Sequence, residues 1–153
     1  MRAVIRIFWQ ICLLRGGPQQ VPTQPWFVAG VVLASLALVT LITRWYDDQS
    51  TSLHILTRTV VYHSTSAFLL WLALYLRELA NRFPASLTAL FGCNLITFAV
   101  VSAIIPAAQL LGEGALALLM LVYLIWSTSV AGFILHRALN VTLGIGIGLA
   151  IGM

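Results

Sequence analysis

The sequence predicts an all-α, polytopic transmembrane helix bundle, with an N-terminal interfacial amphipathic helix, four full spans and a short fifth. Of its 153 residues, 61% are hydrophobic and only 8% are charged, whereas soluble domains carry about 25% charged residues. The mean hydropathy is +1.01, and the apolar residues gather in long runs between short polar segments. A chain this small cannot hide so much apolar surface from water, so we expect lipid to surround most of it.

Residues 1–17 are predicted to form the interfacial amphipathic helix. At about 100° per residue, Arg2 and Arg6 project from one side of the helix, and most apolar residues take the other side. Arg2, Arg6 and Arg15 are therefore expected to contact anionic headgroups at the membrane surface. Residues 18–25 hold three prolines and are predicted to be an extended linker.

Residues 26–153 are predicted to form the transmembrane bundle. The first apolar run has 18 residues, or about 27 Å of helix, which is enough to cross the hydrocarbon core. Polar residues, prolines or arginines end each run, and only a short glycine-containing turn separates the third and fourth spans. The four full spans are predicted at 26–43, 59–76, 86–108 and 115–135.

The final apolar stretch, 138–153, is short for a membrane span. Its 16 residues reach about 24 Å if they are fully helical. Such a segment can cross a thin bilayer, or it can enter partway and stop among the other helices. We expect a short fifth span.

The arginines predict the orientation. With five spans, six of the eight arginines fall on the side of the N-terminus, and only Arg44 and Arg58 fall on the other. Because cytoplasmic loops are enriched in basic residues, the N-terminus is predicted to be cytoplasmic. The arginines are spread singly along the chain, so no nucleic-acid partner is expected.

A polar cluster occurs at the start of the second span. Thr59, His63 and Ser66 share one helical stripe, and Arg58 and Tyr62 share the adjacent one. Polar groups at membrane depth are costly, so they tend to face the bundle interior. Two interpretations stay open here: interhelical hydrogen bonds, or contact with a ligand, a proton or a quinone headgroup.

Small residues recur every four positions in two segments. A side-chain-free stripe lets another helix approach closely, which stabilises helix pairs in lipid. The spacing does not identify the partner, so the stripes fit packing within the chain or at a subunit interface. These candidate packing residues are Gly144, Gly148 and Gly152 in the last segment and Ala99, Ala103 and Ala107 in the third span.

No reaction motif accompanies these patterns. The serines have no His and acid in a nucleophile setting, and no phosphate-binding loop is present. The two cysteines, Cys12 and Cys93, form no metal or redox motif. The histidines fall at different depths or on opposite helix faces, unlike the axial pair of a haem. We therefore expect no enzyme and predict no catalytic, cofactor-binding or metal-binding residue.

The order of segments is accompanied by a few further residues, namely Leu14, Arg15, Gly17, Pro18 and Gln19 near the front and His136, Arg137, Ala138 and Leu139 near the back. Together they resemble small proteobacterial inner-membrane proteins of a Yip1-like type. The resemblance implies a five-span bundle and, from the eukaryotic relatives, a role in membrane trafficking through protein partners; no catalytic residue can be carried over. The short ending at Met153 departs from the longer last span of that group.

Two functional hypotheses follow. The first is a non-enzymatic integral membrane scaffold or accessory subunit, whose partners are the lipid bilayer and other membrane subunits or a second copy of the chain. The alternative is a small transporter, channel or lipid- or quinone-binding protein that uses the polar cluster around Arg58 and His63. The small soluble regions and the glycine stripe favour the first, and the polar cluster favours the second.

Overall fold

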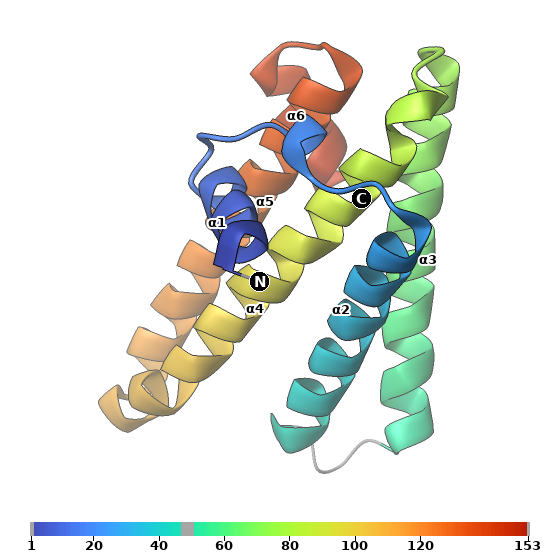
Figure 1. Cartoon of the computed structure of the whole chain (residues 1–153). Coiled ribbons are helices and arrows are strands. Elements are labelled where there is room, and N and C mark those ends of the chain that lie inside the picture. The colour runs from blue at the N-terminus through green and yellow to red at the C-terminus, as the bar shows by residue number, and fades with distance from the viewer. Residues whose placement is uncertain (1, 47–50, 153) are drawn as a thin grey trace.

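The structure, a computed structural model, describes residues 2–46 and 51–152, with side chains described from residue 4 onward. This part of the chain is all-helical (Figure 1). Two short 3-10 turns, Pro18–Gln20 and Ala80–Arg82, interrupt the connections. The six α-helices are α1 (Arg2–Cys12), α2 (Pro25–Tyr46), α3 (Ser52–Leu76), α4 (Phe83–Leu111), α5 (Glu113–Leu139) and α6 (Leu143–Ile151).

Helices α2, α3, α4 and α5 are long and apolar enough to cross a membrane. This confirms the predicted fold class of a polytopic helix bundle. Each helix continues beyond the predicted apolar run, because polar residues at the membrane boundary still satisfy their helical hydrogen bonds. Helix α3 shows this most clearly: it begins at Ser52, and the Thr57 hydroxyl donates to the Leu53 carbonyl oxygen, 2.9 Å away.

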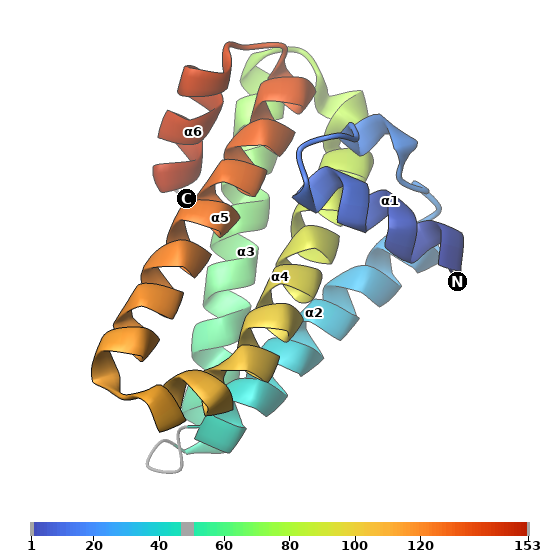
Figure 2. The same cartoon turned by 90° about the vertical axis from the view of Figure 1, so that its left-hand side faces the viewer.

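The four long helices run up and down in chain order, with α4 in the middle of the packing (Figures 1 and 2). Helix α4 packs mainly on α5 and α2, while α2 also packs on α3. Helices α3 and α5 barely touch each other. Because α3 and α5 make few contacts, the bundle is not closed on the side where these two helices face each other.

Helix α1 lies across the bundle and contacts protein as well as its surroundings (Figure 2). Phe8, Ile11 and Cys12 are buried against α4 and α5. The Trp126 indole N–H of α5 donates to the Cys12 carbonyl oxygen at 3.0 Å. The prediction placed the apolar face of this helix in lipid; instead, most of this face packs on the bundle, and Ile5 and Trp9 stay exposed.

The final segment differs from the predicted short span of residues 138–153. Helix α5 ends at Leu139, because Asn140 adopts a left-handed conformation with φ 53°. The chain then turns back, and α6 packs along α5. With 9 residues, α6 extends about 13.5 Å, less than half of a hydrocarbon core of about 30 Å. It is a short helix on the side of α5, and it is too short to cross.

The turn between α5 and α6 is held by the connection between α3 and α4. The Arg82 guanidinium donates to the Ala138 carbonyl oxygen at 3.2 Å and to the Asn140 side-chain oxygen at 3.4 Å. The His136 Nδ1–H donates to the Val141 carbonyl oxygen. A basic side chain at a helix C-terminus satisfies free carbonyl groups and opposes the negative end of the helix dipole. Arg82 therefore caps α5.

Candidate functional site

The predicted polar cluster divides between two surroundings. Arg58 is exposed, and the buried Thr59 hydroxyl donates to the Ile55 carbonyl oxygen one turn earlier at 2.9 Å. His63 contacts α2 and α4, whereas Tyr62 and Ser66 line a cavity on another side of α3. The five residues therefore face more than one environment, although the Tyr62 and His63 rings meet edge to face at a centroid distance of 5.5 Å.

His63 joins three helices through both ring nitrogens and the ring face. Its Nδ1 lies 2.9 Å from the Thr59 carbonyl oxygen and its Nε2 lies 3.0 Å from the Ser35 hydroxyl of α2. A carbonyl oxygen only accepts, so Nδ1 carries a proton; in the neutral ring Nε2 then accepts from Ser35. The ring stacks on Phe91 of α4 at a centroid distance of 4.8 Å. These contacts fit the interhelical hydrogen-bond interpretation.

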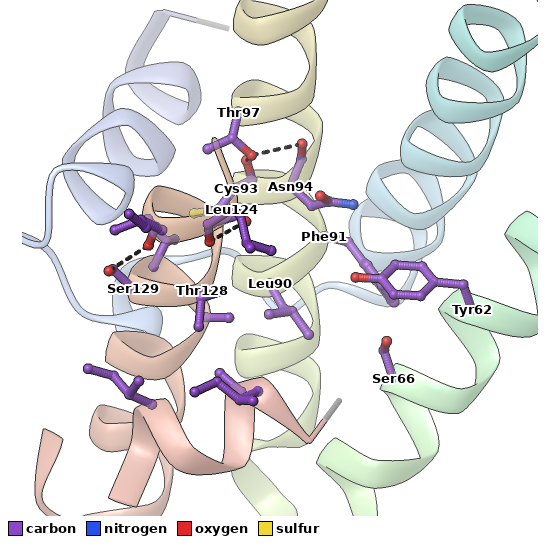
Figure 3. Close-up of a pocket in the computed structure, with 17 residues that line it drawn as sticks. Tyr62, Ser66, Leu90, Phe91, Cys93, Asn94, Thr97, Leu124, Thr128 and Ser129 are labelled. Carbon is purple, nitrogen blue, oxygen red and sulfur yellow. Dashed lines mark hydrogen bonds between the residues drawn. The ribbon is translucent and has the colours of Figure 1, made fainter. Parts of the chain in front are cut away.

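A cavity of about 640 Å³ lies where α3 and α5 diverge (Figure 3). Its wall combines apolar side chains with hydroxyl and amide groups. Several lining residues, Leu124 and Ile125 among them, are exposed at the bundle surface, so the cavity is open at its rim. We call it the α3–α5 cavity. It is lined by Tyr62, Ser66, Leu90, Phe91, Cys93, Asn94, Thr97, Leu124, Ile125, Ser127, Thr128, Ser129, Val130, Ala131, Ile147, Ala150 and Ile151.

Four polar side chains in this wall, those of Tyr62, Ser66, Asn94 and Thr128, make no hydrogen bond among the described residues, and the first three face one another. The Ser66 side chain is only 4% exposed, and its hydroxyl makes no hydrogen bond. The Asn94 amide and the Tyr62 hydroxyl are likewise without one in the described part of the chain. Figure 3 shows Tyr62 and Ser66 on α3 facing the same space as Asn94 on α4. Their donors and acceptors are not used within the described part of the chain.

Three other hydroxyls of the cavity are already satisfied by their own helices. Thr97 donates to the Cys93 carbonyl oxygen at 3.0 Å. Ser127 and Ser129 donate to the carbonyl oxygens of Leu124 and Ile125 at 3.2 and 2.7 Å. No lining residue carries a formal charge at neutral pH. The α3–α5 cavity is therefore polar in one region but uncharged throughout.

The prediction named Tyr62 and Ser66, which line the cavity, as members of the cluster around His63. It named Asn94 and Thr97 of the third span only as a source of an interhelical hydrogen bond, and it did not single out the Ser127–Ser129 segment that α5 contributes. A signal was present, because three consecutive hydroxyl residues inside an apolar run are as costly in lipid as the α3 cluster.

The predicted small-residue stripes are not where the helices approach most closely. A Cβ at Gly144 or Gly148 would meet no atom within 4 Å, and one at Gly152 would meet only its own helix. Ala99 is half-buried, and Ala103 and Ala107 are exposed. The three stripe glycines therefore make no close contact with another helix of the described chain. The choice between packing within the chain and packing at a subunit interface stays open for both stripes.

Two other glycines provide the close contacts. A Cβ at Gly146 of α6 would collide with the Gly132 carbonyl oxygen of α5 and would lie 2.9 Å from the backbone nitrogen of His136. A Cβ at Gly132 would lie 2.8 Å from the Ile147 Cα. Helices α5 and α6 therefore cross backbone to backbone at these two residues.

The predicted membrane-surface arginines keep their exposure where they are described. Arg6 and Arg15 are exposed, while the Arg2 side chain lies outside the described residues. Both exposed guanidinium groups are available to lipid headgroups.

Comparisons with known proteins identify no relative of this chain. The sequence matches no protein-family model, and neither the curated proteins nor the solved structures give a match. The resemblance to the Yip1-like group stays a prediction. Within the described residues, no three His, Cys, Asp or Glu side chains are grouped to hold a metal ion.

Proposed function

We propose that this multi-pass membrane protein is non-enzymatic and binds a neutral amphipathic molecule of the lipid or quinone class in the α3–α5 cavity. The observation that carries the proposal is the unpartnered Ser66 hydroxyl, buried in the cavity wall beside the free groups of Tyr62 and Asn94. A buried polar group without a hydrogen bond costs about 1–3 kcal/mol. A ligand headgroup that bonds to these three side chains removes that cost.

The size and shape of the cavity suit such a ligand. Its volume of about 640 Å³ falls within the usual range for small-molecule sites, about 300–1,000 Å³. The polar groups face the cavity, while the exposed Leu124 and Ile125 form part of the rim. A headgroup therefore fits inside with its apolar tail leaving between α3 and α5 into lipid.

The charge of the lining sets the charge of the headgroup. A charged group in a low-dielectric site is costly unless it is paired, and the lining offers no formal charge. The hydroxyls of Tyr62 and Ser66 and the amide of Asn94 both donate and accept. They suit carbonyl or hydroxyl groups of an uncharged head.

This proposal gives Arg58 and His63 a different role from the one that the sequence suggested for them. Arg58 is exposed, and both nitrogens of His63 are engaged within the bundle. In this proposal His63 supports the α3–α4 wall through Phe91, and Tyr62 and Ser66 contact the ligand.

The test is the set of small molecules that co-purify with the protein. Protein purified in mild detergent is extracted with organic solvent, and neutral amphiphiles are quantified by mass spectrometry. We expect one class to be retained by the wild type and reduced about tenfold or more in a Ser66→Ala, Asn94→Leu double variant, since two lost hydrogen bonds are worth about 1–3 kcal/mol.

Thr65→Ala is the matched control, because Thr65 is the neighbouring hydroxyl on α3 and is exposed. It should retain the ligand. Equal retention by the wild type and the double variant would overturn the proposal. So would enrichment of anionic lipids alone, since the cavity offers them no counter-charge.

A second candidate function is that of an accessory subunit or scaffold of an inner-membrane complex. It is favoured by the open faces of Gly144 and Gly148, where an added Cβ would meet no atom within 4 Å. Such a face accepts another helix closely. If this function holds, Gly144→Leu and Gly148→Leu will release a stoichiometric partner subunit while the isolated chain keeps its thermal stability. Loss of stability without loss of a partner would contradict it.

We also propose that the N-terminus is cytoplasmic in a bacterial inner membrane. The connections between α3 and α4 and between α5 and α6 lie at one end of the bundle (Figure 1), and Arg77, Arg82 and Arg137 lie in or beside them. Arg44 is in the last turn of α2, at the opposite end. A reporter fused to residue 1 should be active only in the cytoplasm; activity on the outer side would contradict the orientation.

A further inference from the structure

The fold brings the two cysteines of the sequence together from distant positions. Cys12 on α1 and Cys93 on α4 are each only 1% exposed, and both are free thiols. The Cys12 Sγ lies 3.9 Å from the Cys93 carbonyl oxygen, and the Cys93 Sγ lies 3.8 Å from the Phe8 carbonyl oxygen. Each thiol is thus directed at the backbone of the other helix.

This juxtaposition depends on the close approach of α1 to α4. Gly92 precedes Cys93, and a Cβ there would collide with the Phe8 ring. The absence of a side chain at Gly92 therefore lets Phe8 lie directly on α4. The Trp126 indole fixes the Cys12 backbone from the other side, through the 3.0 Å hydrogen bond to its carbonyl oxygen.

The two thiols also influence each other chemically. A hydrogen bond from the Cys93 side chain lowers the pKa of the Cys12 thiol, although burial opposes this effect. A lower pKa increases the fraction of thiolate, which is the form that reacts with oxidants. Cys12 is therefore the thiol suited to react first, and Cys93 is placed to resolve the product.

We propose that Cys12 and Cys93 are a redox-active dithiol that a peroxide converts into a disulfide joining α1 to α4. During a transient undocking of α1, the Cys12 thiolate attacks one peroxide oxygen and breaks the O–O bond, giving a sulfenic acid and, after protonation of the leaving oxygen, water. When α1 returns, Cys93 attacks the Cys12 sulfur, the S–S bond forms, and a second water leaves with the Cys93 proton. Two thiols are oxidised, and one peroxide is reduced to two waters.

The disulfide would act on the wall of the α3–α5 cavity, because Cys93 is one of its lining residues. In the reduced state α1 is held by packing and hydrogen bonds alone. In the oxidised state it is covalently attached beside Cys93. The inference needs no ligand in the cavity, so it stands or fails separately from the proposed function.

The first test measures the bond itself. Purified protein in lipid nanodiscs is treated with hydrogen peroxide, unfolded, alkylated with a maleimide and weighed by intact mass spectrometry. We expect an unlabelled monomer lighter by two hydrogen atoms than the reduced chain, and its conversion by reductant to a doubly labelled one. Cys12→Ser and Cys93→Ser should each give no unlabelled monomer.

Full labelling of both thiols after peroxide would overturn the proposal. Oxidation of the thiols only to sulfinic acids, or a disulfide only between two chains, would overturn it equally.

The second test measures the tether in the unmodified sequence, so it does not depend on how the variants fold. Amide hydrogen exchange is followed over residues 2–12 before and after peroxide. A disulfide that keeps α1 attached to α4 should slow the amide hydrogen exchange of residues 2–12 at least tenfold, and reductant should restore the original rate. Exchange that is unchanged by a disulfide formed in high yield would contradict the role of the bond as a tether.

Discussion

The Tyr46 hydroxyl, at the end of α2, donates a hydrogen bond to the Ser102 carbonyl oxygen of α4 at 3.1 Å. Within α4 this carbonyl would normally accept from the residue four positions later. That residue is Pro106, which has no backbone N–H. Tyr46 thus satisfies the carbonyl group that Pro106 leaves free, and it ties α2 to α4 near one end of the bundle.

Removing the Tyr46 hydroxyl should therefore destabilise the bundle. We expect Tyr46→Phe to lower the free energy of unfolding by about 1 kcal/mol, because the Ser102 carbonyl loses its hydrogen bond. The measurement is reversible unfolding in mixed micelles, followed by circular dichroism.

A double-mutant cycle assigns this effect to the proline. In a Pro106→Ala background the Ser102 carbonyl gains an intrahelical partner, so Tyr46→Phe should cost clearly less than in the wild type. An equal cost in both backgrounds would show that the Tyr46 hydroxyl acts in some other way.

The contact between Phe8 and Gly92 predicts a position where a methyl group is not tolerated. Gly92→Ala should destabilise the docking of α1 by about 1–3 kcal/mol, because the new Cβ would overlap the Phe8 ring. Faster hydrogen exchange over residues 2–12 would report the undocked helix.

Gly30→Ala is the control for Gly92→Ala, since a Cβ at Gly30 in α2 would meet no atom within 4 Å. It should leave the exchange of α1 unchanged. Combining Gly92→Ala with Phe8→Leu should recover part of the protection. A Gly92→Ala variant that exchanges like the wild type would rule out this packing.

The glycines of α6 should differ sharply in their tolerance of alanine. Gly146→Ala would place a Cβ against the Gly132 carbonyl oxygen, a backbone atom that cannot rotate away. We expect it to cost about 1–3 kcal/mol and to release α6 from α5. Gly148→Ala, whose Cβ would meet open space, should be neutral or slightly stabilising for the isolated chain. Limited proteolysis near residue 141 measures the release, and the reverse order of sensitivity would contradict this crossing.

Loss of the Ser35–His63 hydrogen bond between α2 and α3 should destabilise the membrane-spanning bundle. Ser35→Ala leaves the His63 Nε2 without its 3.0 Å partner, which should lower the free energy of unfolding by about 1–3 kcal/mol. Ser64→Ala serves as the control, because Ser64 is an exposed neighbour of His63. Thermal unfolding of the two variants should separate them, and equal midpoints would show that the Ser35–His63 bond adds no stability.

The long spans could be predicted because the bilayer imposes a simple requirement on each apolar run. The helix ends depended on local backbone features that periodicity does not report. Asn140, in the left-handed conformation, ends α5 within the apolar stretch that was predicted to continue as one segment. Residues of similar hydropathy lie on both sides of this turn, so the prediction of a single segment at 138–153 missed it.

The site was harder to predict, because its residues meet only through tertiary packing. The α3 cluster stood out as costly polar residues, and Tyr62 and Ser66 do line the cavity. Which residues of the α3 cluster point toward α2 and which line the cavity beside Asn94 depends on how α3 is rotated between α2 and α4. The Cys12–Cys93 pair depended on α1 docking into protein, which an amphipathic pattern alone does not distinguish from docking into lipid.

The most direct measurement of the proposed function is photocrosslinking of the protein in bilayers that contain a neutral lipid with a photoreactive group in its headgroup. Mapping the adducts by mass spectrometry should place them on the residues around the α3–α5 cavity, chiefly 62–66, 90–97 and 124–131, and excess unlabelled lipid should compete for them. Adducts spread along the outer faces of the spanning helices, with no competition and no preference for the cavity, would contradict the account.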